Sequence, residues 1–129
     1  MVAEEAYRAG AKWVDIRWTN QDLDKMRYKK ESVKVLSATQ EWEKARMQYE
    51  LDELPVRIWI DSDDPDGLKG VNVEKMQKAN LARMKVRKPY RDAMENKYQW
   101  TIVAVPSAKW AKKVFPNDRT SVAVKKLWD

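Results

Sequence analysis

The feature that most constrains the fold is an apolar run over residues 100–105 that is stopped by Pro106 and followed at once by Ser107. The run is rich in β-branched residues, which is typical of a buried strand. Ser107 is placed to cap a helix by accepting a hydrogen bond from a first-turn N–H group. Apolar residues then recur at helical spacing from Trp110 until Pro116 ends the pattern. This stretch therefore predicts a strand that leads directly into a helix.

The rest of the chain repeats this alternation of strand and helix patterns. Alternating side chains at 12–18 and an apolar run at 56–61 predict two more strands. Helical patterns cover residues 1–10, 20–29, 38–53, 72–85, 89–96 and 120–128. Ser37 and either Thr120 or Ser121 are the expected N-caps of the helices that follow them. Because strands separated by helices favour parallel crossovers, we expect a three-layer α/β domain with a mainly parallel sheet of about three strands.

The absence of two residue types limits the catalytic and metal-binding chemistry that the side chains of this chain can supply. Neither Cys nor His occurs among the 129 residues, so the chain has no disulfide, no thiolate ligand and no imidazole base. A catalytic role for this chain alone is therefore not expected. The length corresponds to one domain over residues 1–129, and no apolar run approaches the about 20 residues that cross a bilayer. We expect a cytoplasmic protein with no membrane partner.

Seven tryptophans are many for a chain of this length. They are Trp13, Trp18, Trp42, Trp59, Trp100, Trp110 and Trp128. Most fall on faces that the patterns assign to the interior, so we expect them to pack in the core. For one or two of them, the alternative is a half-buried position against another domain.

Four carboxylates follow the second predicted strand, at Asp61, Asp63, Asp64 and Asp66. Carboxylates at the end of a buried strand can hold Mg²⁺ or attack a phosphoryl group. Phosphatases that use an aspartate nucleophile usually have Thr or Val at the position where this chain has Pro65. The favoured interpretation is a polar turn whose carboxylates cap the next helix.

Five basic residues lie within nine positions, at Arg83, Lys85, Arg87, Lys88 and Arg91. Such a cluster can contact nucleic-acid phosphates, and the neighbouring Tyr90 can stack on a base. No glycine-rich or aromatic RNA-binding motif accompanies the cluster. A solvated helix face or a contact with another domain is therefore favoured, and a stand-alone nucleic-acid-binding module is the alternative function.

Short motifs along the chain are also found in known enzymes. The first is Gln-Trp-Thr-Ile-Val at 99–103, followed by Pro106, Trp110-Ala111 and Val114-Phe115-Pro116. Others are Glu5-Ala-Tyr7 with Gly10-Ala11, Asp64-Pro65 with Leu68 and Gly70, and Leu127-Trp128. In these motifs and their order, nearly the whole chain resembles the metal-dependent aminopeptidases of the aminopeptidase T, aminopeptidase S and aminopeptidase II family.

The resemblance implies an internal piece of the amino-terminal domain of such an enzyme, truncated at both ends. It implies that the parent enzyme removes N-terminal residues from peptides, using two divalent ions, Zn or Co, held by a carboxy-terminal domain. Residues 1–129 are then expected to hold no metal and no catalytic residue. Their expected role is to shape substrate access and to contact the carboxy-terminal domain. A homodimer is compatible with this arrangement.

The candidate site is formed by polar groups at the carboxyl ends of the predicted strands. Ligands approach open parallel sheets at this edge, because loops and helix N-termini supply unpaired N–H donors there. The residues concerned are Asn20, Asp61, Ser62 and Ser107, with Trp110 one turn into the helix that Ser107 caps. We expect this edge to border the peptide-access region of the intact enzyme.

Overall fold

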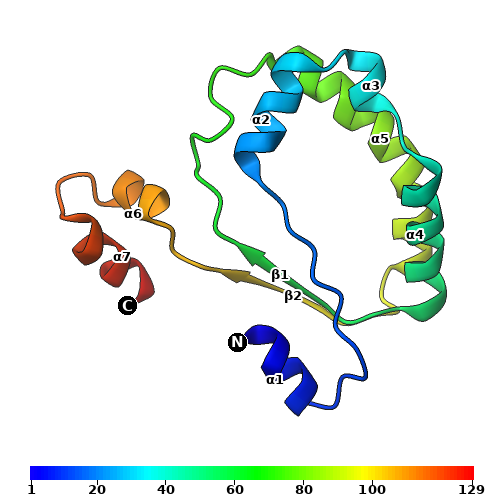
Figure 1. Ribbon diagram of the computed structural model, residues 1–129, viewed down its shortest axis with the longest axis horizontal. Helices are drawn as coiled ribbons and strands as arrows, with labels where there is room; N and C mark the ends of the chain where they lie inside the picture. The colour runs from blue at the N-terminus through cyan, green and yellow to red at the C-terminus, as the bar shows by residue number, and fades with distance from the viewer.

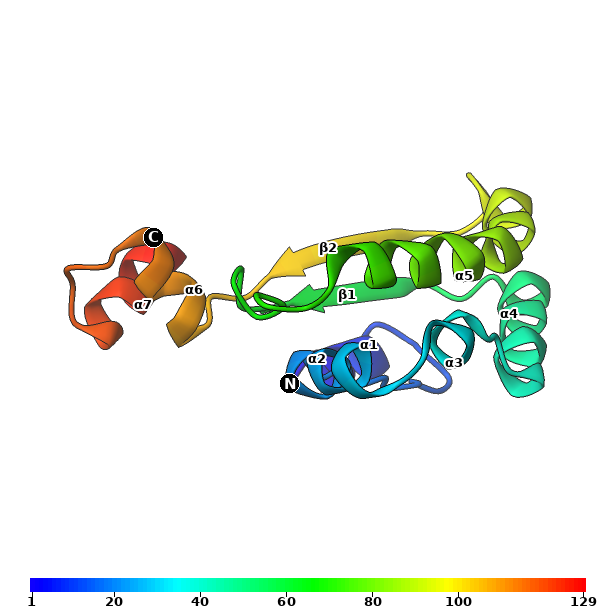
Figure 2. The same ribbon diagram turned by 90° about the horizontal axis from the view of Figure 1, so that it is seen from above.

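The computed structural model describes residues 1–129 as seven helices and two strands. Along the chain these are α1 (Val2–Arg8), α2 (Gln21–Lys30), α3 (Val33–Ser37), α4 (Glu41–Glu53), β1 (Arg57–Asp61), α5 (Val73–Met94), β2 (Trp100–Ala104), α6 (Ala108–Val114) and α7 (Thr120–Trp128). The strands lie at the centre of an elongated molecule, with α6 and α7 beyond one end and α4 at the other (Figure 1). Figure 2 shows α1 and α2 on the side of β1 rather than on the side of β2.

The strands predicted at 56–61 and 100–105 are confirmed as β1 and β2. They pair in parallel, with Arg57 opposite Trp100 at one end and Asp61 opposite Ala104 at the other. The connection between them contains α5, as a parallel crossover requires. The α/β class is therefore confirmed, but the sheet has two strands rather than three.

The third strand, predicted at 12–18, is not formed, and this segment has no regular secondary structure. Its side chains instead contact α4. The ring of Trp13 lies 6.3 Å from that of Tyr49, and the Arg17 guanidinium forms an ion pair with the Glu50 carboxylate. A strand needs a neighbouring strand to pair its N–H and C=O groups, so alternation of side chains alone does not produce one.

The helix patterns predict the presence of helices better than their ends. The two helices predicted on either side of Pro89 form the single helix α5, although the proline lacks an N–H group and so breaks one helical hydrogen bond. Neither Thr120 nor Ser121 caps α7, because the helix already begins at Thr120 and its N-cap is Arg119. Although α5 has 22 residues, neither it nor any other helix is apolar enough to cross a membrane.

The helix predicted over 38–53 is preceded by a separate short helix, α3. Ser37 is the last residue of α3 rather than the N-cap of α4, and Ser32 caps α3 with its hydroxyl group. The actual cap of α4 is Gln40, whose N–H donates to the Glu43 carboxylate at 2.9 Å. The two serines are five residues apart in sequence, so the capping pattern fits more than one helix start.

Little of this chain is buried. Seven of 129 residues are buried, namely Leu36, Glu50, Val71, Ala79, Met94, Ala111 and Ala123. The prediction that the tryptophans form the core is wrong, because every one of them except the half-buried Trp110 is exposed. The helices pack on one another, α3 and α4 on α5 and α6 on α7, and none packs extensively on the strands. The two faces of the sheet are therefore not covered by helix layers within these 129 residues.

Candidate functional site

The carboxyl ends of β1 and β2 lie side by side and bring four of the five predicted site residues together. Asp61 ends β1, and its C=O accepts a hydrogen bond from the Val105 N–H at 2.7 Å. Ser62 follows directly on the same loop. Ser107 caps α6 as predicted, because its hydroxyl oxygen accepts a hydrogen bond from the Trp110 N–H at 3.2 Å. The predicted capping role of Ser107 is therefore confirmed.

The fifth predicted residue, Asn20, reaches the same region through its neighbour. Asn20 caps α2 by accepting a hydrogen bond from the Leu23 N–H at 3.0 Å. The side-chain amide of Gln21 then pairs with the backbone of Asp64, donating to its C=O at 3.0 Å and accepting from its N–H at 3.1 Å. This pair of bonds fixes the N-terminus of α2 to the turn that follows β1.

Gln21 is a site residue that sequence reasoning missed. Its amide lies so close to Gly67 that a Cβ atom on that residue would overlap the amide group. Gly67 also closes the predicted turn, since its N–H donates to the Asp64 C=O at 2.9 Å. The glycine is the one sequence signal of a close approach, but it does not reveal which side chain approaches.

The carboxylates after β1 act as turn and ion-pairing groups, which confirms the predicted polar turn. The prediction that they cap the next helix is wrong, because Asn72 caps α5 by accepting a hydrogen bond from the Lys75 N–H at 2.9 Å. Asp61 accepts a hydrogen bond from the Asp63 N–H at 3.2 Å, and Asp64 accepts one from the Asp66 N–H at 3.0 Å. Two lysines on α6 reach the same loop. Lys113 lies 2.5 Å from the Asp66 carboxylate, and Lys109 lies 3.6 Å from that of Asp64.

The ion pair between Lys113 and Asp66 orients the loop and shifts the pKa values of both groups. The hydrogen bond from Lys113 lowers the pKa of Asp66 despite an opposing contribution from desolvation, and the same contact raises the pKa of Lys113. Lys112 points the other way along α6, where its ammonium donates to the C=O groups of Pro116 and Asp118, both at 2.6 Å. The lysines of α6 thus bind the loops on both sides of the helix.

These residues do not fit a divalent metal centre of the kind the resemblance implies for the parent enzyme. No group of three or more His, Cys, Asp or Glu side chains in residues 1–129 is arranged to hold a metal ion. The carboxylates nearest to one another already accept backbone N–H groups or pair with Lys109 and Lys113. The chemistry that this edge can perform is hydrogen bonding and charge pairing.

The basic cluster at 83–91 does not form one free cationic surface. Arg83 pairs with the Glu43 carboxylate and donates to the Ala38 C=O at 2.6 Å. Lys88 and Arg91 both pair with Asp92. Lys85 and Arg87 form no ion pair. This arrangement does not favour the alternative of a nucleic-acid-binding module, since three of the five cations are held by the carboxylates of Glu43 and Asp92.

A second group of charges lies near the opposite ends of the strands. The Glu50 carboxylate is buried, 8% exposed, and lies between two guanidinium groups. Arg57 donates to it at 2.5 Å, and Arg17 forms the second ion pair. Arg57 also lies over the ring of Tyr98, at 5.0 Å from the ring centroid. These contacts join α4, the 12–18 segment and the start of each strand.

The fold and the site together define the class of protein as a parallel α/β domain whose carboxyl edge carries polar groups rather than a metal centre. The chain matches the thermophilic metalloprotease (M29) family along all of residues 1–129, and it belongs to that family. The predicted resemblance to metal-dependent aminopeptidases is thereby confirmed.

Individual relatives agree with this assignment. The chain is 32% identical to aminopeptidase PepS of Streptococcus thermophilus over 131 residues, and 31% identical to aminopeptidase T of Thermus thermophilus over 130 residues. The solved structure of wild-type AmpT from Thermus thermophilus superposes with a TM-score of 0.83 and 31% identity, over 98% of this chain and 32% of that one. The chain thus spans about a third of the length of these relatives.

Proposed function

We propose that this chain is a non-catalytic part of a cytoplasmic metallo-aminopeptidase that removes N-terminal residues from peptides. In this proposal, two divalent ions, Zn or Co, are held by a carboxy-terminal domain outside residues 1–129. Family membership along the whole chain is the observation that carries the proposal. The relatives bear aminopeptidase names and are about three times as long, which leaves room for a separate catalytic domain.

The surface area of this chain supports the need for a partner domain. A compact monomer of 15.2 kDa exposes about 7,100 Å² by size scaling. This chain exposes 10253 Å², an excess of about 3,100 Å² over that scaling. Permanent interfaces bury about 2,000–5,000 Å² in total, or about 1,000–2,500 Å² from each partner. The excess on this one chain therefore exceeds that range and leaves ample surface for docking on a further domain.

The sheet is the part of the surface best suited to such docking. Sheets with parallel strands almost always have both faces covered. Here Trp59 and Ile102 lie opposite each other on one face and are 56% and 61% exposed, while Ile60 and Val103 on the other face are 53% and 43% exposed. Covering these side chains stabilises the domain through burial of apolar surface, at about 25 cal/mol per Å².

We further propose that the carboxyl edge, with Asn20, Asp61, Ser62, Ser107 and Trp110, borders the path of peptide substrates. The Gln21–Asp64 hydrogen bonds and the ion pairs of Lys109 and Lys113 support this proposal, because together they join the three segments that carry these residues. Trp110 is the one half-buried tryptophan and offers an aromatic surface beside polar groups.

The experiment that tests these proposals replaces the matching third of aminopeptidase T of Thermus thermophilus with this chain. The purified chain alone is expected not to hydrolyse an aminoacyl-anilide with added Zn²⁺ or Co²⁺, whereas the chimera is expected to be active. A change of Ile102 to Lys should prevent the chimera from assembling. Leu81→Lys, at an exposed apolar position on α5 away from the sheet, is the matched control. Hydrolysis by the chain alone, or equal effects of the two changes, would contradict the proposal.

The proposed role of Trp110 in substrate access is tested by enzyme kinetics in the same chimera. Trp110→Ala is expected to raise KM for peptides with little change in thermal stability. A loss of stability with unchanged kinetics would instead assign Trp110 a packing role only.

A further inference from the structure

A groove of about 310 Å³ lies between α2 and α5, and none of the predicted site residues lines it. Its lining includes the buried side chains of Leu36 and Ala79, which are 5% and 1% exposed. Three arginines, Arg27, Arg83 and Arg87, also line this α2–α5 groove. The groove therefore combines an apolar base with three arginine side chains and one carboxylate, that of Asp24. Its volume is at the lower end of the about 300–1,000 Å³ of small-molecule sites.

Two of the three arginines are held in place by carboxylates outside the groove lining. Arg27 donates to Glu31 at 2.9 and 3.3 Å, one turn further along α2. Arg83 pairs with Glu43, whose side chain is 17% exposed. These pairs neutralise much of the two charges, but they also fix the positions of the guanidinium groups that form the walls.

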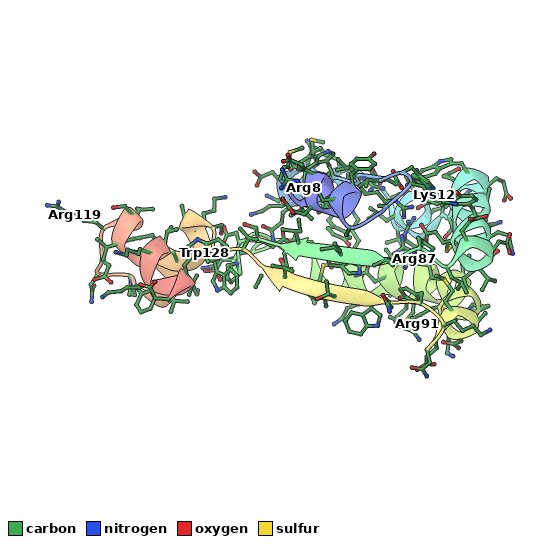
Figure 3. The ribbon with its side chains drawn as sticks, turned by 90° about the horizontal axis from the view of Figure 1, so that it is seen from below. Arg8, Lys12, Arg87, Arg91, Arg119 and Trp128 are labelled. Atoms are coloured by element: carbon green, nitrogen blue, oxygen red, sulfur yellow. The ribbon has the colours of Figure 1, made fainter.

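Arg87 differs from the other two, because it forms no hydrogen bond or ion pair within the chain. Figure 3 shows it near the end of the molecule where α4 lies. Its charge helps to lower the pKa of Glu43, so it lies within electrostatic reach of the Arg83–Glu43 pair without joining it. All five of its N–H donors thus stay free, in the planar arrangement that matches two oxygens of a carboxylate or phosphate.

The remaining polar groups of the groove complete a set dominated by donors. The side-chain carbonyl of Asn80 accepts a hydrogen bond from the Tyr28 hydroxyl at 3.2 Å, so its NH₂ group is left to donate. Thr19 contributes a hydroxyl group, and Asp24 is the one carboxylate in the lining. Glu31 and Glu43 pair with Arg27 and Arg83, so Arg87 is the cation of the lining that is left to bind a negatively charged group.

We infer that the α2–α5 groove binds the oxyanion group of a small molecule, a phosphate or a carboxylate, with Arg87 as the bidentate anchor and Asn80 as a second donor. The other basic side chains of the 83–91 segment, Lys85, Lys88 and Arg91, do not line the groove. A nucleic-acid strand would need a row of cations along its backbone, so the arrangement fits a compact ligand better. This inference is independent of the aminopeptidase proposal.

The test is isothermal titration calorimetry of the full chain at constant ionic strength, with inorganic phosphate and with the dipeptide glycylglycine as probes. Binding with a dissociation constant on the order of 1 mM is expected for at least one probe. Arg87→Ala should weaken it at least tenfold, and Arg87→Lys should also weaken it because a lysine cannot bind two oxygens in a fork. Lys85→Ala is the matched control, since it removes an unpaired charge two residues away that faces outside the groove.

The outcomes separate the ligand sources and the competing explanations. Binding of phosphate alone assigns a phosphoryl ligand, and binding of glycylglycine alone assigns a carboxylate. Equal weakening by Arg87→Ala and Lys85→Ala would indicate general charge attraction and would overturn the inference. If neither probe binds at about 20 mM, on the order of twenty times the expected dissociation constant, the inference is also overturned. It is likewise overturned if a single-stranded oligonucleotide binds far more tightly than the probes and its binding depends on both Arg87 and Lys85. Circular dichroism confirms folding, which Arg87→Ala should not disturb, because the Arg87 side chain has no partner to lose.

Discussion

The change of Glu50 to Gln removes one negative charge from a buried position while keeping the size of the side chain. Glu50 is 8% exposed and lies between Arg57, whose side chain is 25% exposed, and Arg17, whose side chain is 46% exposed. The bond to Arg57 is charge-assisted and mostly shielded, so we assign it about 1.5–3 kcal/mol. The bond to Arg17 is half exposed to solvent, which limits it to about 0–1 kcal/mol.

The neutral amide of Gln can still accept a weaker hydrogen bond, so the net loss in the free energy of unfolding is expected to be about 2 kcal/mol. For a chain of this length that corresponds to a fall in Tm of about 8 °C, at roughly 4 °C per kcal/mol. The assay is urea and thermal unfolding followed by circular dichroism at low protein concentration. Hydrogen exchange of the 12–18 segment should also accelerate, because Arg17 ties that segment to α4.

The matched control for this experiment is Glu53→Gln. Glu53 is exposed at the C-terminal end of the same helix and forms no ion pair. Losing a negative charge there should change stability by only a few tenths of a kcal/mol, in the favourable direction, because the C-terminal end of a helix is negative. If Glu50→Gln changes stability as little as Glu53→Gln does, the assignment of Glu50 as a stabilising bridge is refuted.

Three further expectations follow from the same contacts. Gly67→Ala should displace the Gln21 amide and lower the free energy of unfolding. In a Gln21→Ala background this loss should be about 1–2 kcal/mol smaller, as a double-mutant cycle of urea unfolding would measure. Additive effects of the two changes would count against the close contact. Burial raises the pKa of Glu43, but the hydrogen bond and charge of Arg83 outweigh burial and leave it lowered. The stabilisation from this pair is therefore present above about pH 4.3 and is lost as the pH falls through the lower pKa of the folded state. The difference in free energy of unfolding between the unchanged chain and Glu43→Gln should accordingly shrink below about pH 4. A difference that stays constant down to about pH 3 would disprove this expectation. Finally, calorimetry of the chain should detect no micromolar Mg²⁺ or Ca²⁺ site. A site abolished by Asp61→Asn would overturn the assignment of these carboxylates as turn and ion-pairing groups.

Much of the carboxyl edge could be predicted from sequence because its contacts are local. Pro106 stops β2, Ser107 caps α6, and the capped N–H belongs to Trp110, three residues away. Each of these features depends on neighbours within one helical turn. A pattern in the sequence is therefore enough to place them.

The features that prediction missed depend on distant partners. The Gln21 amide and the Asp64 backbone are 43 residues apart in sequence, and no local signal pairs them. The 12–18 segment alternates as a strand does, yet whether it pairs depends on a neighbouring strand rather than on its own residues. The tryptophans of the strands are apolar, but their burial depends on what covers the sheet, and in this chain Trp59 and Trp100 are 56% and 61% exposed.

Each strand of the pair has one edge without a hydrogen-bonding neighbour, since the sheet consists of β1 and β2 alone. Both strands carry exposed, mostly uncharged side chains such as Ile58 and Ile102, and such edges are templates for pairing with further copies of the same chain. The strands also meet only after α5 has been made, so they stay unpaired for part of synthesis. We therefore expect this chain, produced alone, to aggregate through its strands as its concentration rises. If a further domain docks on the sheet as proposed above, it should suppress that aggregation as an intramolecular chaperone would.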